Sequence, residues 1–232
     1  MARLRLLPIL LGVLLMCASP APAAGLIVAV PSDGCPSADL LSDLARLVVR
    51  KAGLTPQVLR LPLADIPGAL GRGQANAALA DPSPALRAVA DNLGPVVSLK
   101  LVLVPRAATV VRSPRDLAGK TLSLYRSDAC LSATVRGFGA SPLPTPDTGQ
   151  ALRLALAGRA DAALGWERTV LAWQQKERYP ARALGKPIVL GVHAPCLLLA
   201  KGRSADSRRL REALTRLVRS GAVDAEAAKR LQ

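Results

Sequence analysis

GQANAAL at Gly73–Leu79 and GRADAAL at Gly158–Leu164 are two copies of one short pattern. Each copy follows a stretch with apolar residues at helical spacing, Ile66–Leu70 before the first and Gln150–Ala157 before the second. The glycine that opens each copy is placed to end that helix, because glycine adopts a left-handed conformation at little cost. The alanine-rich remainder is typical of a short buried strand. The repeat therefore predicts two similar α/β lobes.

The stretches around the two copies follow the same alternation of strand and helix. Apolar runs predict further strands at 26–30, 57–61, 99–104, 120–125 and 194–200. Helical spacing predicts helices at 40–48, 130–137 and 207–220. Strands that alternate with helices favour parallel sheets, and such sheets bind ligands at the carboxyl ends of their strands. We therefore expect any ligand site where loops leave those strand ends.

The composition indicates a compact basic protein. Of 232 residues, 50% are hydrophobic and 20% are charged, which excludes disorder and coiled coil. Thirty-one Lys and Arg against 16 Asp and Glu leave a net charge of +15, suited to anionic partners such as carboxylates. With 2 Trp, 2 Tyr and 1 Phe, the chain has too few aromatic rings to stack single-stranded bases. We expect a monomer with no nucleic-acid partner.

The N-terminus is typical of a signal peptide. Arg3 and Arg5 precede an apolar run at Leu6–Met16, and the small residues Ala21-Pro22-Ala23 follow. The run is too short for a transmembrane helix. The alternatives are an anchor that is not cleaved and a lipoprotein acylated at Cys17. We predict cleavage of residues 1–23 and a periplasmic location.

Three cysteines remain after such a cleavage: Cys35, Cys130 and Cys196. In an oxidising compartment they would form one disulfide and leave one thiol, or form an intermolecular bridge. With His193, the only histidine, they could alternatively complete a tetrahedral zinc site, although no Cys-x-x-Cys pair would nucleate it. The sequence holds no GxSxG, P-loop or HExxH motif. We expect no metal, no cofactor and no catalytic residue.

Three segments resemble the extracellular solute-binding proteins of family 3. They are Ser113–Leu124, Ala157–Leu164, and Leu210–Leu217 followed by Gly221. The resemblance implies a two-lobed periplasmic-binding-protein fold of the α/β class, in which each lobe is a mainly parallel sheet flanked by helices and two strands form the hinge. It places lobe 1 at 24–97 and 202–232 and lobe 2 at 98–201. It also implies that a small solute is captured between the lobes and passed to the membrane permease of an ABC transporter.

The same resemblance implies the residues that face the cleft. The expected loops are 32–35, 81–83, 126–130 and 166–167, and the expected ligand-binding residues are Ser32, Asp33, Asp81, Ser83, Arg87, Ser127, Asp128 and Trp166. Arg87 corresponds to an arginine that clamps the solute's carboxylate in amino-acid binders. Trp166 stands where those binders place an aspartate for the ammonium group, so we expect an anionic solute other than an ordinary α-amino acid. A plain core position is the alternative interpretation of Trp166.

Two other functions have some support in the sequence. The stretch DAALGW at Asp161–Trp166 also resembles binding proteins associated with quinoprotein alcohol dehydrogenases, so an accessory role with a periplasmic dehydrogenase is an alternative. A dehydratase-like enzyme on this fold is a further alternative, with Asp33, Asp81, Asp128 and Glu167 as unspecific candidates for a general acid or base.

The resemblance also implies a pairing of the cysteines. It places Cys130 and Cys196 together in lobe 2 and Cys35 in the other lobe. A bridge from Cys35 would cross the cleft and oppose the hinge motion that solute capture needs. We therefore predict a Cys130–Cys196 disulfide and a free thiol at Cys35.

Overall fold

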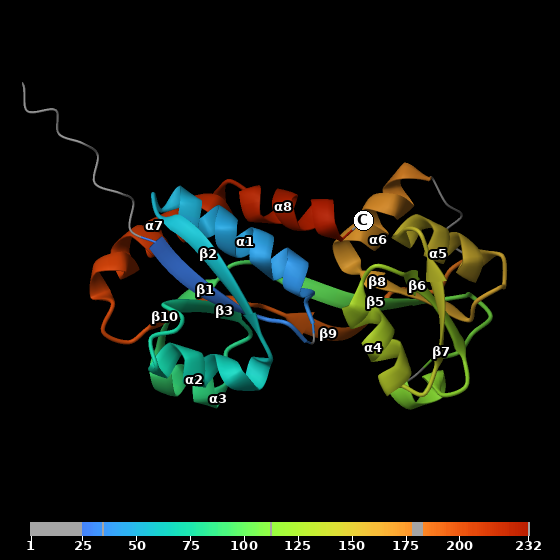
Figure 1. The fold of residues 1–232 in the computed structure, drawn as a ribbon. Coiled ribbons are helices and arrows are strands. Elements are labelled where there is room, and N and C mark those ends of the chain that lie inside the picture. The colour runs from blue at the N-terminus through green and yellow to red at the C-terminus, as the bar shows by residue number, and fades with distance from the viewer. Residues whose placement is uncertain (1–24, 34, 112, 178–182, 232) are drawn as a thin grey trace, which may run out of the picture.

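A computed structural model describes residues 25–33, 35–111, 113–177 and 183–231. They form two α/β lobes side by side, each built on a five-stranded sheet (Figure 1). The predicted signal peptide at 1–23 lies outside the described residues. No helix in the described ranges is long and apolar enough to cross a membrane.

The first sheet has the strand order β2-β1-β3-β10-β4. Its strands are β1 (Gly25–Pro31), β2 (Thr55–Leu61), β3 (Ala77–Ala80), β4 (Ala90–Pro95) and β10 (Cys196–Ala200). β1 runs parallel to β2 and β3, whereas β10 is antiparallel to β3 and β4. The first lobe also contains η1 (Leu63–Asp65) and the helices α1 (Ala38–Lys51), α2 (Ile66–Gly71), α3 (Pro84–Val89), α7 (Ser204–Arg219) and α8 (Ala222–Arg230).

The second sheet repeats this arrangement with the order β7-β6-β8-β5-β9. Its strands are β5 (Leu99–Pro105), β6 (Thr121–Tyr125), β7 (Ser141–Thr145), β8 (Ala162–Trp166) and β9 (Ile188–His193). β6 is parallel to β7 and β8, and β5 is the reversed strand. The lobe also holds η2 (Pro114–Leu117), α4 (Ala129–Gly137), α5 (Thr148–Leu156) and α6 (Glu167–Lys176).

The sequence repeat occupies equivalent places in the two sheets, which confirms the prediction of two similar lobes. Gly73 and Gly158 have φ angles of 71° and 72°, and each turns the chain from a helix into a fully buried strand, β3 or β8. Asn76 Oδ1 accepts a hydrogen bond from the Ile27 amide at 3.0 Å. Asp161 Oδ2 accepts one from the Thr121 amide at 2.9 Å. The Asn/Asp position therefore ties each repeat strand to its neighbour.

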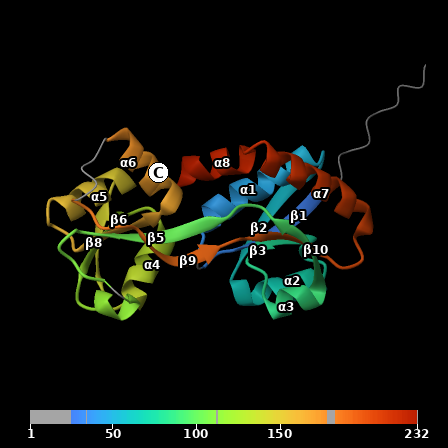
Figure 2. The ribbon, with the colours of Figure 1, turned by 180° about the vertical axis from the view of Figure 1, so that it is seen from behind.

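The chain passes from the first sheet to the second between β4 and β5. It returns between β9 and β10, before the expected return near Lys201-Gly202 (Figure 2). The strand predicted at 194–200 therefore belongs to the first sheet and not to the second lobe. The physical reason is pairing: its buried residues form an antiparallel ladder with the equally buried β3. The sequence does not show to which sheet an apolar strand will pair.

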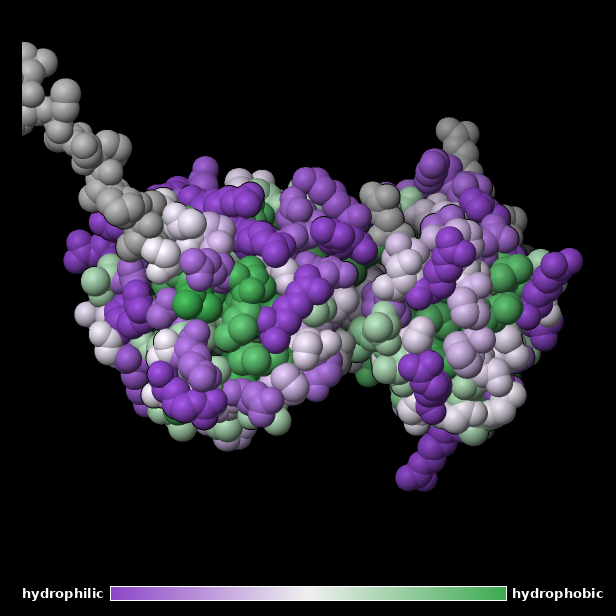
Figure 3. All heavy atoms as spheres, viewed as in Figure 1, coloured by the Kyte–Doolittle hydropathy of each residue, from purple (hydrophilic) through white to green (hydrophobic). Residues whose placement is uncertain are grey.

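Several elements were not predicted from the sequence. They are the strands β4, β7 and β9 and the helices α3, α6 and α8. All three strands lie at sheet edges. β4 and β7 have few apolar residues, whereas β9 is an apolar run that sequence reasoning overlooked. β2 is the fourth edge strand, and Figure 3 shows apolar side chains at the surface over it.

Candidate functional site

The two repeats end at residues that converge on one histidine. Asp81 follows β3 and Trp166 ends β8, at equivalent positions of the repeat. Asp81 Oδ2 lies 3.2 Å from His193 Nδ1, and its Oδ1 accepts a hydrogen bond from the Ala194 amide at 3.0 Å. The Trp166 ring packs edge-on against the His193 ring, with ring centroids 5.9 Å apart. His193 ends β9, so both lobes contact the segment where the chain crosses back.

Asp128 continues this chain of contacts within the second lobe. It is the N-cap of α4, and its Oδ1 accepts hydrogen bonds from the amides of Cys130 and Leu131 at 3.0 and 3.4 Å. Its Oδ2 accepts a bond from Trp166 Nε1 at 2.9 Å. Asp128 is 6% exposed and Trp166 is 2% exposed. Three donors therefore offset the cost of burying this charge, and Trp166 is held inside the lobe.

A small polar cavity of about 160 Å³ lies where the lobes meet. Residues from both lobes line it: Ser37, Asp39, Tyr125, Ser127, Asp128, Lys229 and Arg230. The first two belong to the start of α1, the next three to the end of β6 and the turn into α4, and the last two to the end of α8. The cavity therefore lies between the start of α1, the carboxyl end of β6 and the C-terminal helix.

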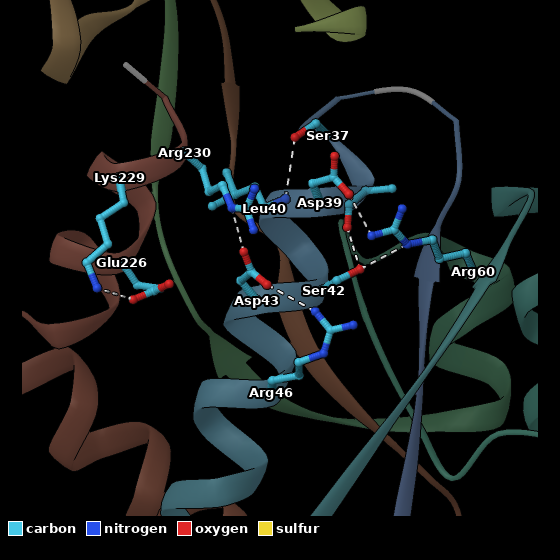
Figure 4. Close-up of polar contacts among 11 residues, drawn as sticks. Ser37, Asp39, Leu40, Ser42, Asp43, Arg46, Arg60, Glu226, Lys229 and Arg230 are labelled. Atoms are coloured by element: carbon cyan, nitrogen blue, oxygen red, sulfur yellow. Dashed lines mark hydrogen bonds and ion pairs between the residues drawn. The ribbon is translucent and has the colours of Figure 1, made fainter. Parts of the chain in front are cut away.

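The charged groups beside this cavity are paired with each other (Figure 4). Arg230 Nε lies 2.6 Å from Asp43 Oδ2 on α1, and Lys229 Nζ lies 2.8 Å from Glu226. Asp39 Oδ1 lies 2.6 Å from Arg60 Nη2. The arginines and the lysine of these pairs are about half exposed or more, whereas Asp43 and Glu226 are more buried, so the pairs are weak and can rearrange around a ligand.

Helix ends add neutral hydrogen-bonding groups to the cavity. The Ser37 side chain caps α1, where it accepts a bond from the Leu40 amide at 3.5 Å. The free amides and partial positive charge of a helix N-terminus favour an anion. The arrangement therefore offers hydroxyls, helix amides and two cations to a small ligand.

The other predicted site residues lie outside this cavity. Ser32 is exposed, and its amide donates to the Leu61 carbonyl at 2.7 Å. Asp33 accepts a bond from the Leu63 amide at 2.9 Å, and Ser83 caps α3 by accepting one from the Leu86 amide at 3.3 Å. The fourth, Arg87, is exposed on α3. The structure thus gathers Ser127 and Asp128 at the cavity and Asp81 and Trp166 at His193.

Sequence reasoning missed the cavity residues Ser37, Asp39, Tyr125, Lys229 and Arg230 and the contacts of His193. Ser37 could have been found, because a serine three residues before an apolar helical pattern is a recognisable N-cap. Lys229 and Arg230 carry no such signal. They reach the site only because α8 packs on α1.

The predicted disulfide is wrong. Cys35 is bonded to Cys130, with their Cα atoms 5.0 Å apart, and Cys196 is a buried free thiol. The reason is that β10 pairs within the first sheet, which moves Cys196 away from lobe 2, while the loop after β1 meets the start of α4. The three-cysteine zinc alternative fails for the same reason. Among the described residues, no group of three or more His, Cys, Asp or Glu could hold a metal ion.

Cys196 lies at the start of β10, and its Sγ donates to the Ala194 carbonyl at 3.4 Å. Burial raises the pKa of this thiol, and the Asp81 carboxylate adds to the rise. A hydrogen bond with Asn92 and the charge of Arg87 act in the opposite direction. Cys196 is therefore a protonated, unreactive thiol at neutral pH.

No protein-family model matches the sequence, and no curated protein matches it. Solved structures do match over nearly the whole chain. The YckB protein of Bacillus subtilis has a TM-score of 0.57 and 17% identity, covering 90% of this chain and 89% of that one. The L-cystine solute receptor of Neisseria gonorrhoeae, in its unliganded open conformation, has a TM-score of 0.51 and 19% identity, covering 90% and 93%. The GluR0 ligand-binding core in complex with L-glutamate has a TM-score of 0.51 and 16% identity, covering 91% and 100%.

These likenesses confirm the predicted fold, two α/β lobes of the periplasmic-binding-protein type. At such low identity they establish the fold alone.

Proposed function

We propose that this protein is an exported binding protein that holds a small, anionic, carboxylate-bearing solute between its two lobes and presents it to an ABC-type permease. The observation that carries the proposal is the polar cavity lined from both lobes and from α8. A ligand held there contacts both lobes at once, which is how two-lobed binding proteins couple binding to their conformation. The disulfide supports export, because such bonds persist in oxidising compartments.

The chemistry of the lining favours an anion. Lys229 and Arg230 bring two cations, whose exposed ion pairs with Glu226 and Asp43 a ligand can displace, and Ser37 and Ser127 bring hydroxyls beside the N-terminus of α1. The two carboxylates of the lining, Asp39 and Asp128, are already held by an arginine and by the α4 amides. A cavity of about 160 Å³ limits the solute to a few non-hydrogen atoms.

Arg87 remains the second candidate for the carboxylate anchor. It is exposed, and in the described part of the chain it makes no ion pair, so its guanidinium is available for bidentate binding. Replacing Arg87 and Arg230 with alanine, one at a time, shows which of the two arginines binds the carboxylate.

The test is a titration of the purified mature protein with a panel of small carboxylic acids, followed by calorimetry and by thermal unfolding. We expect at least one acid to bind and to raise the unfolding temperature. In the variant that loses the anchor, affinity should fall by about 2–5 kcal/mol while folding stays near wild type. Binding that is equal in both variants removes both arginines from the site, and no binding by any acid contradicts the proposal.

One observation favours the alternative, an accessory binding protein of a periplasmic quinoprotein dehydrogenase. The two lobes are joined by a disulfide, and a fixed pair of lobes suits a docking module better than a repeatedly opening receptor. This alternative predicts a complex with a purified quinoprotein dehydrogenase in sedimentation velocity and no binding of the acids.

A further inference from the structure

We propose that the Cys35–Cys130 disulfide is a redox-controlled tether between the two lobes: while oxidised it holds them at one opening, and a dithiol reductant that attacks Cys35 frees them. The proposal concerns the lobes themselves and does not depend on the identity of any solute.

The disulfide joins equivalent points of the two lobes. Cys35 lies in the loop between β1 and α1, and Cys130 lies in the first turn of α4, directly after β6. β1 and β6 hold the same position in their sheets, each second from one edge and beside the repeat strand. The two cysteines are 95 residues apart in sequence. The bond therefore links the lobes across the ends of matching strands and does not brace either lobe internally.

The backbone connections leave a hinge that this bond restrains. The chain crosses between the lobes in two short segments, Val96–Ser98 and Ala194-Pro195, which lie side by side because the Val96 amide donates to the Pro195 carbonyl at 2.9 Å. Two adjacent extended segments permit rotation of one lobe against the other. The disulfide is a third, covalent connection outside both segments. It holds the Cα atoms of Cys35 and Cys130, one in each lobe, 5.0 Å apart.

The remaining links between the lobes are weak by comparison. In the described part of the chain, α8 is tied to α6 of the second lobe by Arg168–Asp224 at 3.0 Å, and Thr169 Oγ1 donates to the Leu231 carbonyl at 3.0 Å. Asp81 of the first lobe contacts His193 at 3.2 Å. The ion pair is partly exposed and the others are single hydrogen bonds, so each contributes little and exchanges with water. Among the described residues, the disulfide is the one side-chain link between the lobes that is covalent, so rotation of the lobes cannot break it.

The two sulfur atoms differ in their access to solvent. Cys130 is 1% exposed, whereas Cys35 is only partly buried. A reductant thiolate can therefore attack Cys35, forming a mixed disulfide while the S–S bond breaks and Cys130 leaves as a thiolate that takes up a proton. The second thiol of the reductant then attacks the mixed disulfide, which releases Cys35 as a thiol and the reductant as its cyclic disulfide. Cys196 takes no part, because it is buried on β10 with its thiol protonated.

The experiment compares small-angle scattering of the mature protein in three states: oxidised, reduced with dithiothreitol, and reoxidised. The Cys35→Ser/Cys130→Ser double variant is the permanent reduced form, and Cys196→Ser is the matched control that leaves the bridge intact. We expect a larger radius of gyration and a broader distance distribution in the reduced protein and the double variant, with return to the starting curve on reoxidation. The control should not respond until it is reduced. An unchanged curve on reduction overturns the proposal.

Hydrogen exchange measured by mass spectrometry separates lobe release from unfolding. Released lobes should lose protection around residues 35–39 and 126–132 while the core strands β3 and β8 keep theirs. If β3 and β8 lose protection as well in the reduced wild-type protein, the bridge holds the fold and not the lobe separation, and the proposal is wrong. This readout applies even if the double variant does not fold.

Discussion

The two lobes carry the same repeat and use it in the same way, yet they end it differently. In each lobe a left-handed glycine leads into a buried strand, and an Asn or Asp side chain binds the amide of the neighbouring strand. The position at the end of the repeat is Asp81 in the first lobe and Trp166 in the second, and both contact His193. The part of the repeat that builds the lobe is thus shared, and the part that contacts His193, beside the segment where the chain crosses back, has diverged.

The largest predicted difference lies at this diverged position. Trp166→Ala should lower the free energy of unfolding by about 3–5 kcal/mol, because it empties a buried site and leaves Asp128 Oδ2 without its donor. Asp81→Ala should cost only about 0.5–1.5 kcal/mol, because its side chain is 42% exposed. Urea unfolding followed by circular dichroism measures both. Equal losses would show that the two ends of the repeat are interchangeable.

The shared Asn/Asp position should behave alike in both lobes. Asn76→Ala and Asp161→Ala each leave a strand amide without its acceptor, so each should cost about 1–3 kcal/mol. The loss should be greater for Asp161, because an ionised acceptor makes the stronger bond. Asn76→Asp is the matched control and should stay within about 1 kcal/mol of wild type, because a carboxylate fills the same role at Asp161. A large loss in the control would contradict the equivalence of the two repeats.

The repeat glycines should show a smaller, nearly equal effect. Gly73→Ala and Gly158→Ala place a side chain at positive φ, which should cost about 1–2 kcal/mol each in urea unfolding. A Cβ at Gly158 would also lie 3.1 Å from Arg106 Nη1, whereas Gly73 has open space. Gly71→Ala is the control, since Gly71 lies in α2 with open space and no positive φ, and alanine there should be neutral or stabilising. A loss at Gly71 as large as at Gly73 would rule out backbone strain as the cause.

The smallest effect should come from the ion pairs that tie α8 to each lobe. Arg230→Ala and Arg168→Ala should each cost about 0.2–1 kcal/mol, since both pairs are partly exposed. The cost should be greater for Arg230, because its partner Asp43 is 18% exposed against 38% for Asp224. Repeating the unfolding in ~1 M salt should nearly abolish both effects, because the screening length falls to about 3 Å. Salt-independent losses would indicate packing of the arginine stems.

The sequence by itself determined the parts of this protein that depend on neighbours along the chain. The helix–glycine–strand repeat at Gly73 and Gly158 and the apolar strands of both sheets follow from local spacing and backbone preference, and the structure confirms them. The two-lobed fold follows as well, because alternating strands and helices have few ways to bury both faces of a sheet.

Only the tertiary structure decided what depends on pairing between distant segments. Which sheet takes β10, and therefore which cysteine meets Cys130, is set by hydrogen bonds between strands more than a hundred residues apart. The cavity beside Lys229 and Arg230 exists because α8 returns to α1 at the end of the chain. No periodicity in the sequence predicts such contacts, because their free energy comes from surfaces that meet only once the chain has folded.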